Sequence, residues 1–219
     1  MTTRQIYDSP TDSNSNGLID PFNRRIEYLR LSVTDKCNLR CFYCLPRHFK
    51  DFEQPAHWLT FDEIERVIGV FADLGVAKVR LTGGEPLLRR DLPDLVKQLS
   101  QRAGVEDLSL STNAVLLSRQ AQALREAGIS RINVSLDTLN PDRFTQIAGG
   151  KLQPVLDGLM AARQAGFAPI KINMVVMKGI NDDEFEDMVD FCLEHDFTLR
   201  FIETMPVGDT GVDASQHYL

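Results

Sequence analysis

Short apolar runs alternate with longer amphipathic segments along the chain from residue 28 onward. The apolar runs are rich in Val, Ile and Leu, which is typical of strands that are buried in a parallel sheet. Strands are expected over residues 28–34, 77–83, 107–112, 131–136, 169–177 and 198–204. Between them, apolar residues recur at helical spacing, as at Ile64, Val67, Ile68 and Phe71, and predict amphipathic helices.

The predicted helices begin at side chains that can accept hydrogen bonds from free backbone N–H groups. Such starts are expected as capping boxes at Thr60 with Glu63 and at Asn181 with Glu184, and as single N-caps at Asp91 and Asn140. Pro141 fits the first helical position after Asn140, because a proline there needs no hydrogen-bond partner for its nitrogen.

Repetition of strand and helix requires parallel pairing with right-handed crossovers. Six units predict an α/β fold, a partial (β/α)6 TIM-like barrel with its helices outside, although an open doubly wound sheet has the same pattern. The core barrel is expected over residues 26–206. Residues 1–25 are rich in Ser, Asn, Asp and Pro and predict a flexible arm, and residues 207–219 form a short tail.

Composition narrows the classes of partner. The chain has 219 residues, of which 43% are hydrophobic, enough for one core. A net charge of -7 argues against a broad nucleic-acid interface, so an anionic substrate must be held by a few local cations. Four cysteines without a signal segment or a long apolar stretch predict a cytoplasmic protein with no membrane partner.

Three cysteines follow the first predicted strand in the run CNLRCFYC. Cys37, Cys41 and Cys44 have the spacing Cys-x3-Cys-x2-Cys and supply three thiolates. On a [4Fe-4S] cluster, three thiolates leave one iron free to bind a substrate. The alternatives are part of a zinc site, or cysteines without a ligand. Cys192 lies in an apolar helix and is expected to be a buried core residue.

Polar residues also stand where the other predicted strands end, and the ends of parallel strands converge on one rim. Gly83, Gly84 and Glu85 follow the second strand, where glycines permit close approach of a ligand and the carboxylate can accept from an ammonium group. A turn is the alternative for the two glycines. The remaining strand-end candidates are Ser111, Ser135, Asp137 and Met205.

Three cations interrupt apolar strand runs. Arg30, Arg80 and Lys171 lie inside predicted strands, where an unpaired cation is costly. Each therefore requires an anion, either a carboxylate such as Glu203 or a bound ligand. Three cations on different strand units favour a phosphate-bearing ligand.

The cysteine motif, Tyr43 and the later TGGEP resemble the radical S-adenosylmethionine (SAM) enzymes. Longer runs, including LRLSVTDKCNLRCFYCLP and VRLTGGEPLLRRDLP, resemble the GTP 3',8-cyclase family of molybdenum cofactor biosynthesis over residues 26–219. The resemblance implies a [4Fe-4S] cluster on the three cysteines. By the same resemblance, SAM is contacted by Tyr43, Gly84, Glu85, Ser135 and Met205, and GTP by Arg30, Arg80, Ser111 and Lys171.

The implied reaction is reductive. An electron from a flavodoxin- or ferredoxin-type donor cleaves SAM, and the resulting 5'-deoxyadenosyl radical takes the hydrogen from C3' of GTP. The C3' radical then attacks C8, which gives 3',8-cyclo-7,8-dihydro-GTP. The resemblance also implies a homodimer.

Two departures from the family are visible. Ala114 stands where the family more often has Gly, which is expected to alter a turn near the nucleotide. The family's second [4Fe-4S] cluster has no ligands in this chain, so the expected activity of this chain is impaired. A single-cluster radical SAM enzyme with another substrate, and a non-enzymatic metal- or nucleotide-binding module, remain as alternatives.

Overall fold

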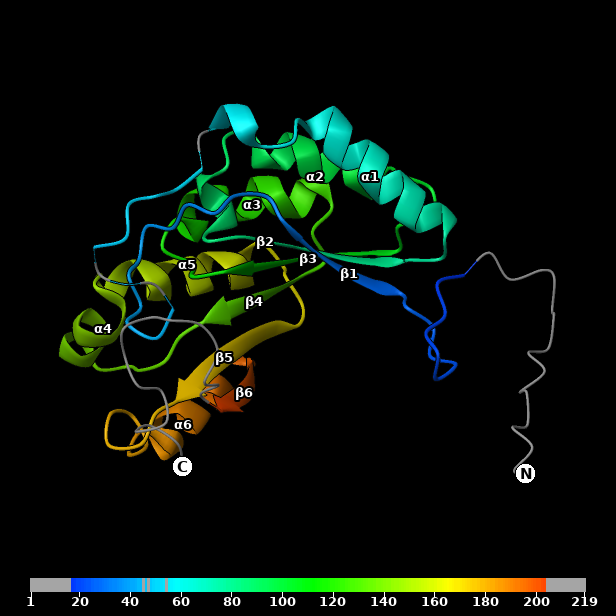
Figure 1. Ribbon diagram of the computed structural model, residues 1–219. Coiled ribbons are helices and arrows are strands. Elements are labelled where there is room, and N and C mark those ends of the chain that lie inside the picture. Colours follow the sequence, from blue (N-terminus) through cyan, green and yellow to red (C-terminus); the bar gives the residue numbers. More distant parts are fainter. Residues whose placement is uncertain (1–16, 45, 47, 54, 204–219) are drawn as a thin grey trace, which may run out of the picture.

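The computed structural model describes residues 17–44, 46, 48–53 and 55–203. It contains one six-stranded parallel sheet in the order β1-β2-β3-β4-β5-β6 (Figure 1). The strands are β1 (Tyr28–Ser32), β2 (Lys78–Thr82), β3 (Asp107–Thr112), β4 (Arg131–Ser135), β5 (Ile170–Val176) and β6 (Thr198–Glu203). All six predicted strands are confirmed within a few residues at each end.

Helices follow the strands in alternation. They are α1 (Phe61–Asp73), α2 (Leu92–Ser100), α3 (Leu117–Ala127), α4 (Pro141–Ala148), α5 (Gln153–Gln164) and α6 (Phe185–His195), with short 3-10 helices η1 (Pro55–His57) and η2 (Pro86–Leu88). Because the strand order never reverses, there is no switch point of the kind that a doubly wound sheet requires. The partial barrel is therefore confirmed.

The hydrophobic core lies between the sheet and its helices. Alternate strand residues such as Leu81, Leu110 and Ile132 are fully buried on the helix-facing side. Figure 1 shows the sheet curving beneath α1, α2 and α3. The other face of the sheet, which we call the inner face, carries the intervening polar side chains, so binding chemistry is confined to that face and to the strand ends.

The helix starts show which capping predictions hold. The box at Thr60 and Glu63 is present, with both reciprocal hydrogen bonds, and Asn140 accepts from the amides of the first helical turn. Asp91 occupies the N-cap position of α2, but its φ of 56° places it in the left-handed region and its side chain caps nothing.

The second predicted capping box is wrong. Asn181 is buried and donates to the carbonyl oxygens of Asp137 and Val175, while Glu184 accepts from Thr138 and from the Leu139 amide. Both side chains are occupied in tying the segment between β5 and α6 to the segment after β4. Neither caps α6: Glu184 is the N-cap residue of this helix, but its side chain makes no capping hydrogen bond.

Residues 17–25 differ from the predicted flexible arm. Ile19 pairs with Arg25 in an antiparallel bridge, and the Leu18 amide donates to the Leu74 carbonyl at the end of α1. Asp20 closes the turn by accepting from the amides of Phe22 and Arg24. Residues 1–16 and the predicted tail, 207–219, lie outside the described residues.

Within the described part of the chain, no helix combines the length and apolar character that crossing a membrane would need.

Candidate functional site

The loops that follow β1, β2, β3 and β4 meet at one rim of the sheet. The Gly84 amide donates to the Thr34 carbonyl and the Glu85 amide to the Lys36 carbonyl, so the second loop lies against the cysteine loop. Asn113, after β3, and Asp137, after β4, reach the cysteine loop through their side chains. The structure thus brings together strand-end residues that are distant in the sequence.

The cysteines that the sequence singled out share this rim. Cys37 and Cys41 are half-buried and Cys44 is exposed, and the Cys44 amide donates to the Cys41 carbonyl at 2.9 Å. No group of three His, Cys, Asp or Glu side chains among the described residues is arranged around a single metal ion. A [4Fe-4S] cluster does not require such a group, because its thiolates bind different irons.

The surroundings of the three thiols raise their pKa values. Burial, followed by the nearby charges of Asp137, Cys44 and Cys37, raises the pKa of Cys41 to about 12. Burial is also the largest cause that raises the pKa values of Cys37 and Cys44. Without metal the thiols stay protonated, so binding of iron must release their protons.

Glu85 supports the rim from inside the protein. Its side chain has 0% exposure, and its carboxylate accepts from the Leu87 amide at 3.0 Å, the Thr112 hydroxyl at 2.7 Å and the Asn113 amide at 2.7 Å. Burial raises its pKa, and these hydrogen bonds oppose the rise. All three contacts are internal, so the geometry favours a positioning role over the predicted contact with a ligand's ammonium group.

Asn113 continues this support to the first cysteine. Its side-chain nitrogen, Nδ2, lies 3.8 Å from the Cys37 sulfur and 2.8 Å from the Asn38 side-chain oxygen. The sequence places Asn113 at the end of the third predicted strand, on the rim, but assigns it no contact. Its position directly after a buried strand end was the available signal, but the contact with Cys37 depends on how the loops fold.

The two glycines before Glu85 are needed for close approach of the cysteine loop. A Cβ at Gly83 would lie 2.3 Å from the Thr34 carbonyl oxygen, and one at Gly84 would lie 2.3 Å from the Asp35 carbonyl oxygen. Any larger residue would push the two loops apart. The glycines therefore have a structural role, in addition to the ligand contact expected of Gly84.

Tyr43 connects the cysteine loop to the end of β4. Its hydroxyl donates to Asp137 at 2.6 Å, and the other carboxylate oxygen of Asp137 accepts from the Val175 amide at 2.8 Å. Burial raises the pKa of Asp137 to about 6. Burial, followed by the charge of Asp137, raises the pKa of Tyr43. The hydrogen bond between Tyr43 and Asp137 therefore holds Tyr43, the residue directly before Cys44, in place.

The predicted cations gather on the inner face. Arg30 and Arg80 are direct partners in the β1–β2 register, and Lys171 lies opposite Asn133. Among the described residues, none of the three forms an ion pair, so the alternative of a salt bridge to Glu203 is not seen in this part of the chain. Arg80 donates to the Ser109 hydroxyl at 3.3 Å and lies over the Tyr28 ring.

Two further cations, which the sequence analysis missed, share this face. Arg131 lies opposite Ser109 and Arg200 opposite Asn173 in the strand register. Arg131 pairs with Asp107, whereas the Arg200 Nε and the Asn173 side-chain oxygen are buried without a hydrogen-bond partner in the described structure. The signal was present, because both arginines lie inside predicted strands, but only the register shows which face they occupy.

These cations repel one another. Burial lowers the pKa of Lys171, and the charges of Arg200, Arg131 and Arg80 lower it further. The pKa of Arg80 is lowered by burial and by Arg131, Arg200 and Arg30. Only Arg131 of these cations has an ion-pair partner among the described residues, so a bound anion would reduce the repulsion between them.

The remaining candidates are placed as follows. Ser111 is half-buried at the end of β3 on the inner face, and Ser135 is exposed at the end of β4. Met205 lies outside the described residues. Cys192 is buried in α6, with 2% exposure, which confirms its prediction as a core residue.

Comparison with curated proteins reveals clear relatives. The chain is 53% identical over 210 residues to the GTP 3',8-cyclase of Hydrogenovibrio crunogenus. It is 45% and 47% identical, each over 203 residues, to the proteins of that name from Petrotoga mobilis and Listeria monocytogenes. Each match covers 92% of this chain but only 61 to 63% of the relative, so the chain spans about three fifths of the length of these relatives.

Solved structures with a similar fold are more distant in sequence. SuiB of Streptococcus suis bound to S-adenosylmethionine has a TM-score of 0.72 at 20% identity, covering 84% of this chain and 42% of SuiB. HydG, a maturase of the [FeFe]-hydrogenase, has a TM-score of 0.67 at 15% identity, covering 87% of this chain and 45% of HydG. At these identities the likeness concerns the fold. Residues 31–192 match the radical SAM superfamily as a family, and the chain therefore belongs to that superfamily.

Proposed function

We propose that this chain cleaves S-adenosylmethionine at a three-cysteine [4Fe-4S] cluster and directs the resulting radical to GTP, as a GTP 3',8-cyclase. The observation that carries the proposal is the inner face, where Arg30, Arg80, Lys171 and Arg200 form no ion pair with a carboxylate of the described residues. The identity to curated cyclases supports the assignment of GTP as the anion.

The donor set fits the cluster. Cys37, Cys41 and Cys44 supply three soft thiolates from one loop, and Asn113 orients the first of them. When bound, the cluster supplies the electron that cleaves SAM into methionine and the 5'-deoxyadenosyl radical. The fourth cysteine, Cys192, is buried in α6, so we assign the chain no ligand for a second cluster.

The rim residues hold this loop and the cosubstrate. Glu85 holds the cysteine loop through Asn113, which contacts Cys37. Asp137 holds the same loop through Tyr43. These contacts hold the thiols in place before metal binds. By the resemblance, Tyr43, Gly84, Ser135 and Met205 contact SAM. The exposed position of Ser135 at the end of β4 suits that role.

The inner-face cations bind the triphosphate. Arginine and lysine both suit phosphate oxygens, and GTP brings several negative charges to a face that repels itself when empty. The predicted contacts are Arg30, Arg80, Lys171 and the hydroxyl of Ser111. Arg200 joins them because its Nε is buried and has no hydrogen-bond partner among the residues that the structure describes. Holding the phosphates fixes the ribose, so that C3' meets the radical before C8 of the same molecule is attacked.

The test is calorimetric titration of the cluster-loaded chain with GTP, and with guanosine as a ligand without phosphate. We expect GTP to bind, guanosine to bind at least about tenfold more weakly, and Arg80→Ala to weaken GTP binding by about tenfold. Lys97→Ala, on the outer surface of α2, is the control for a lost positive charge. Equal affinity of the chain and Arg80→Ala for GTP would overturn the proposal.

The reaction also needs a one-electron donor, for which a flavodoxin- or ferredoxin-type protein is the expected class. By the same resemblance we expect the protein to be cytoplasmic and to form a homodimer. Light scattering of the purified chain measures its oligomeric state.

A further inference from the structure

A basic depression lies on the outer side of the cysteine loop. Lys36, Arg89 and Arg90 line it together with Trp58 and Leu88, around a cavity of 490 Å³. Lys36 directly precedes Cys37, and its carbonyl accepts from the Glu85 amide at 2.7 Å. We call these five residues the basic rim surface.

The cations of the basic rim surface have no acidic partner. Within the described part of the chain, none of Lys36, Arg89 and Arg90 forms an ion pair. The Arg89 guanidinium donates to the carbonyl oxygens of Val33 and Leu59, and burial lowers its pKa. On a chain of net charge -7, three adjacent cations without a carboxylate mark a surface for an acidic partner.

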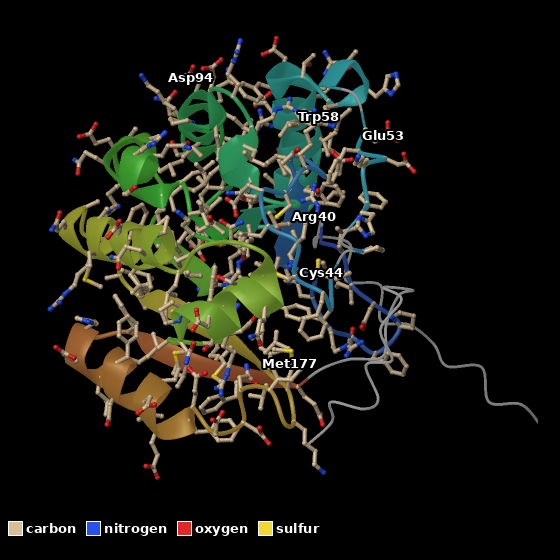
Figure 2. All side chains as sticks on the ribbon, turned by 90° about the vertical axis from the view of Figure 1, so that its left-hand side faces the viewer. Arg40, Cys44, Glu53, Trp58, Asp94 and Met177 are labelled. Atoms are coloured by element: carbon tan, nitrogen blue, oxygen red, sulfur yellow. The ribbon has the colours of Figure 1, made fainter. Side chains whose placement is uncertain are left out.

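The surface continues toward the cysteines. Arg40, inside the cysteine loop, donates to the carbonyl oxygens of Cys37 and Leu39 and lies over the Phe52 ring. In Figure 2 the labelled Cys44, Arg40 and Trp58 lie along one side of the molecule. A protein seated here would lie against the loop that holds the three thiols.

The geometry favours a protein surface over a small ligand. Lys36 and Arg89 both lie over the Trp58 ring, at 5.4 and 4.9 Å from its centre, so the ring is not free to stack on a base. Leu88, 38% exposed, adds an apolar contact beside the charges, as protein interfaces commonly have. A neighbouring cavity shares Trp58 and Arg89 with this surface and is also lined by Asp35 and Glu53, so the positive region ends where these carboxylates begin.

We propose that the basic rim surface is the docking site for an acidic one-electron carrier protein that reduces the cluster. The inference rests on the proposed function, because only the reductive cleavage of SAM requires the electron. In the step, the carrier is oxidised by one electron and the cluster is reduced by one, and no bond to the chain forms or breaks. The GTP cations lie on the inner face, so carrier and substrate bind at different places.

The test compares carrier binding with chemical reduction. The probe is a reduced flavodoxin, and its affinity for the reconstituted chain is measured by interferometry at about 20 and about 300 mM salt. In parallel, 5'-deoxyadenosine formation is measured with the flavodoxin and with dithionite, which needs no docking site. The variants are Arg90→Glu and Lys36→Glu with Arg90→Glu, and Lys97→Glu on α2 is the matched charge reversal.

We expect Arg90→Glu to weaken flavodoxin binding by about tenfold at low salt, with a smaller difference at high salt, and the double variant to weaken it further. Flavodoxin-driven cleavage falls in step, while the dithionite rate of Arg90→Glu and both rates of Lys97→Glu stay unchanged. Unchanged affinity in both rim variants overturns the inference, as does binding that adding salt leaves unaltered. A chain that binds the flavodoxin but cleaves no SAM with dithionite contradicts the proposed function instead.

Discussion

The rim around the cysteines and the inner face of the sheet are both polar, but they differ in how their polar groups are satisfied. At the rim, Glu85 and Asp137 are buried and their carboxylates accept hydrogen bonds from neighbouring loops. On the inner face, Arg80 and Lys171 repel other cations, and the Arg200 Nε has no partner within the described residues. The rim holds its loops in place without a ligand, whereas the cations of the inner face are left to be matched by the anion that we propose binds there.

Replacement of Glu85 should give the largest loss of stability. Glu85→Ala leaves the Thr112 hydroxyl and the amides of Leu87 and Asn113 without their acceptor, so we expect the free energy of unfolding to fall by about 3 kcal/mol. Urea denaturation of the metal-free chain measures it. Glu85→Gln keeps the shape and one of the two acceptor oxygens and should cost less than Glu85→Ala. Equal stability of all three proteins would show that the rim is not held by this carboxylate.

Asp137 should make the stability of the fold depend on pH. Its pKa of about 6 in the fold exceeds its ordinary value of 3.8, so between these values the folded chain binds more protons than the unfolded chain. Its contribution to stability is therefore present below about pH 4 and is lost as the pH rises to about 6. Stability curves of the metal-free chain and Asp137→Asn should diverge in this window, and parallel curves would contradict the assigned environment.

Replacement of a cation on the inner face should affect ligand binding more than stability. Arg200→Ala removes a cation that repels Lys171, so the stability of the ligand-free chain should change by less than about 0.5 kcal/mol. GTP affinity should fall by about tenfold, because one phosphate contact is lost. A large loss of stability with unchanged GTP affinity would place Arg200 among the structural residues.

Replacement of Ala114 should have the smallest effect of these substitutions. Ala114 holds a φ of 61° in the turn after β3 with 0% exposure, a conformation that glycine adopts without strain. Ala114→Gly should therefore raise the free energy of unfolding by up to about 1 kcal/mol, an effect that a loss in thermal denaturation would refute. Because glycine can adopt the same backbone conformation and keeps the amide that donates to Thr112, GTP affinity should stay the same.

The sequence predicted the strands, the barrel and the three cysteines, because alternation of apolar runs and the spacing of a short motif are local properties. It also found Arg30, Arg80 and Lys171, since a cation inside an apolar strand is visible without coordinates. Arg131 and Arg200 were missed because their role depends on the register between strands.

The roles of Glu85 and Asn181 show a second limit. Glu85 was expected to face a ligand and Asn181 to cap a helix, yet both are buried and bind backbone groups of other loops. Which partner a side chain accepts depends on loops that are distant in the sequence. Motif reading therefore located Glu85 at the rim and Asn181 before a helix without telling which groups their side chains bind.

The account's central claim is tested most directly by anaerobic reconstitution of the chain with iron and sulfide, followed by measurement of 5'-deoxyadenosine formed from SAM with dithionite, with and without GTP. We predict about four irons per chain and cleavage of SAM that GTP stimulates in the chain but not in a variant with Arg80 and Lys171 replaced by Ala. Zinc in place of iron, or cleavage that GTP leaves unchanged, would contradict the account.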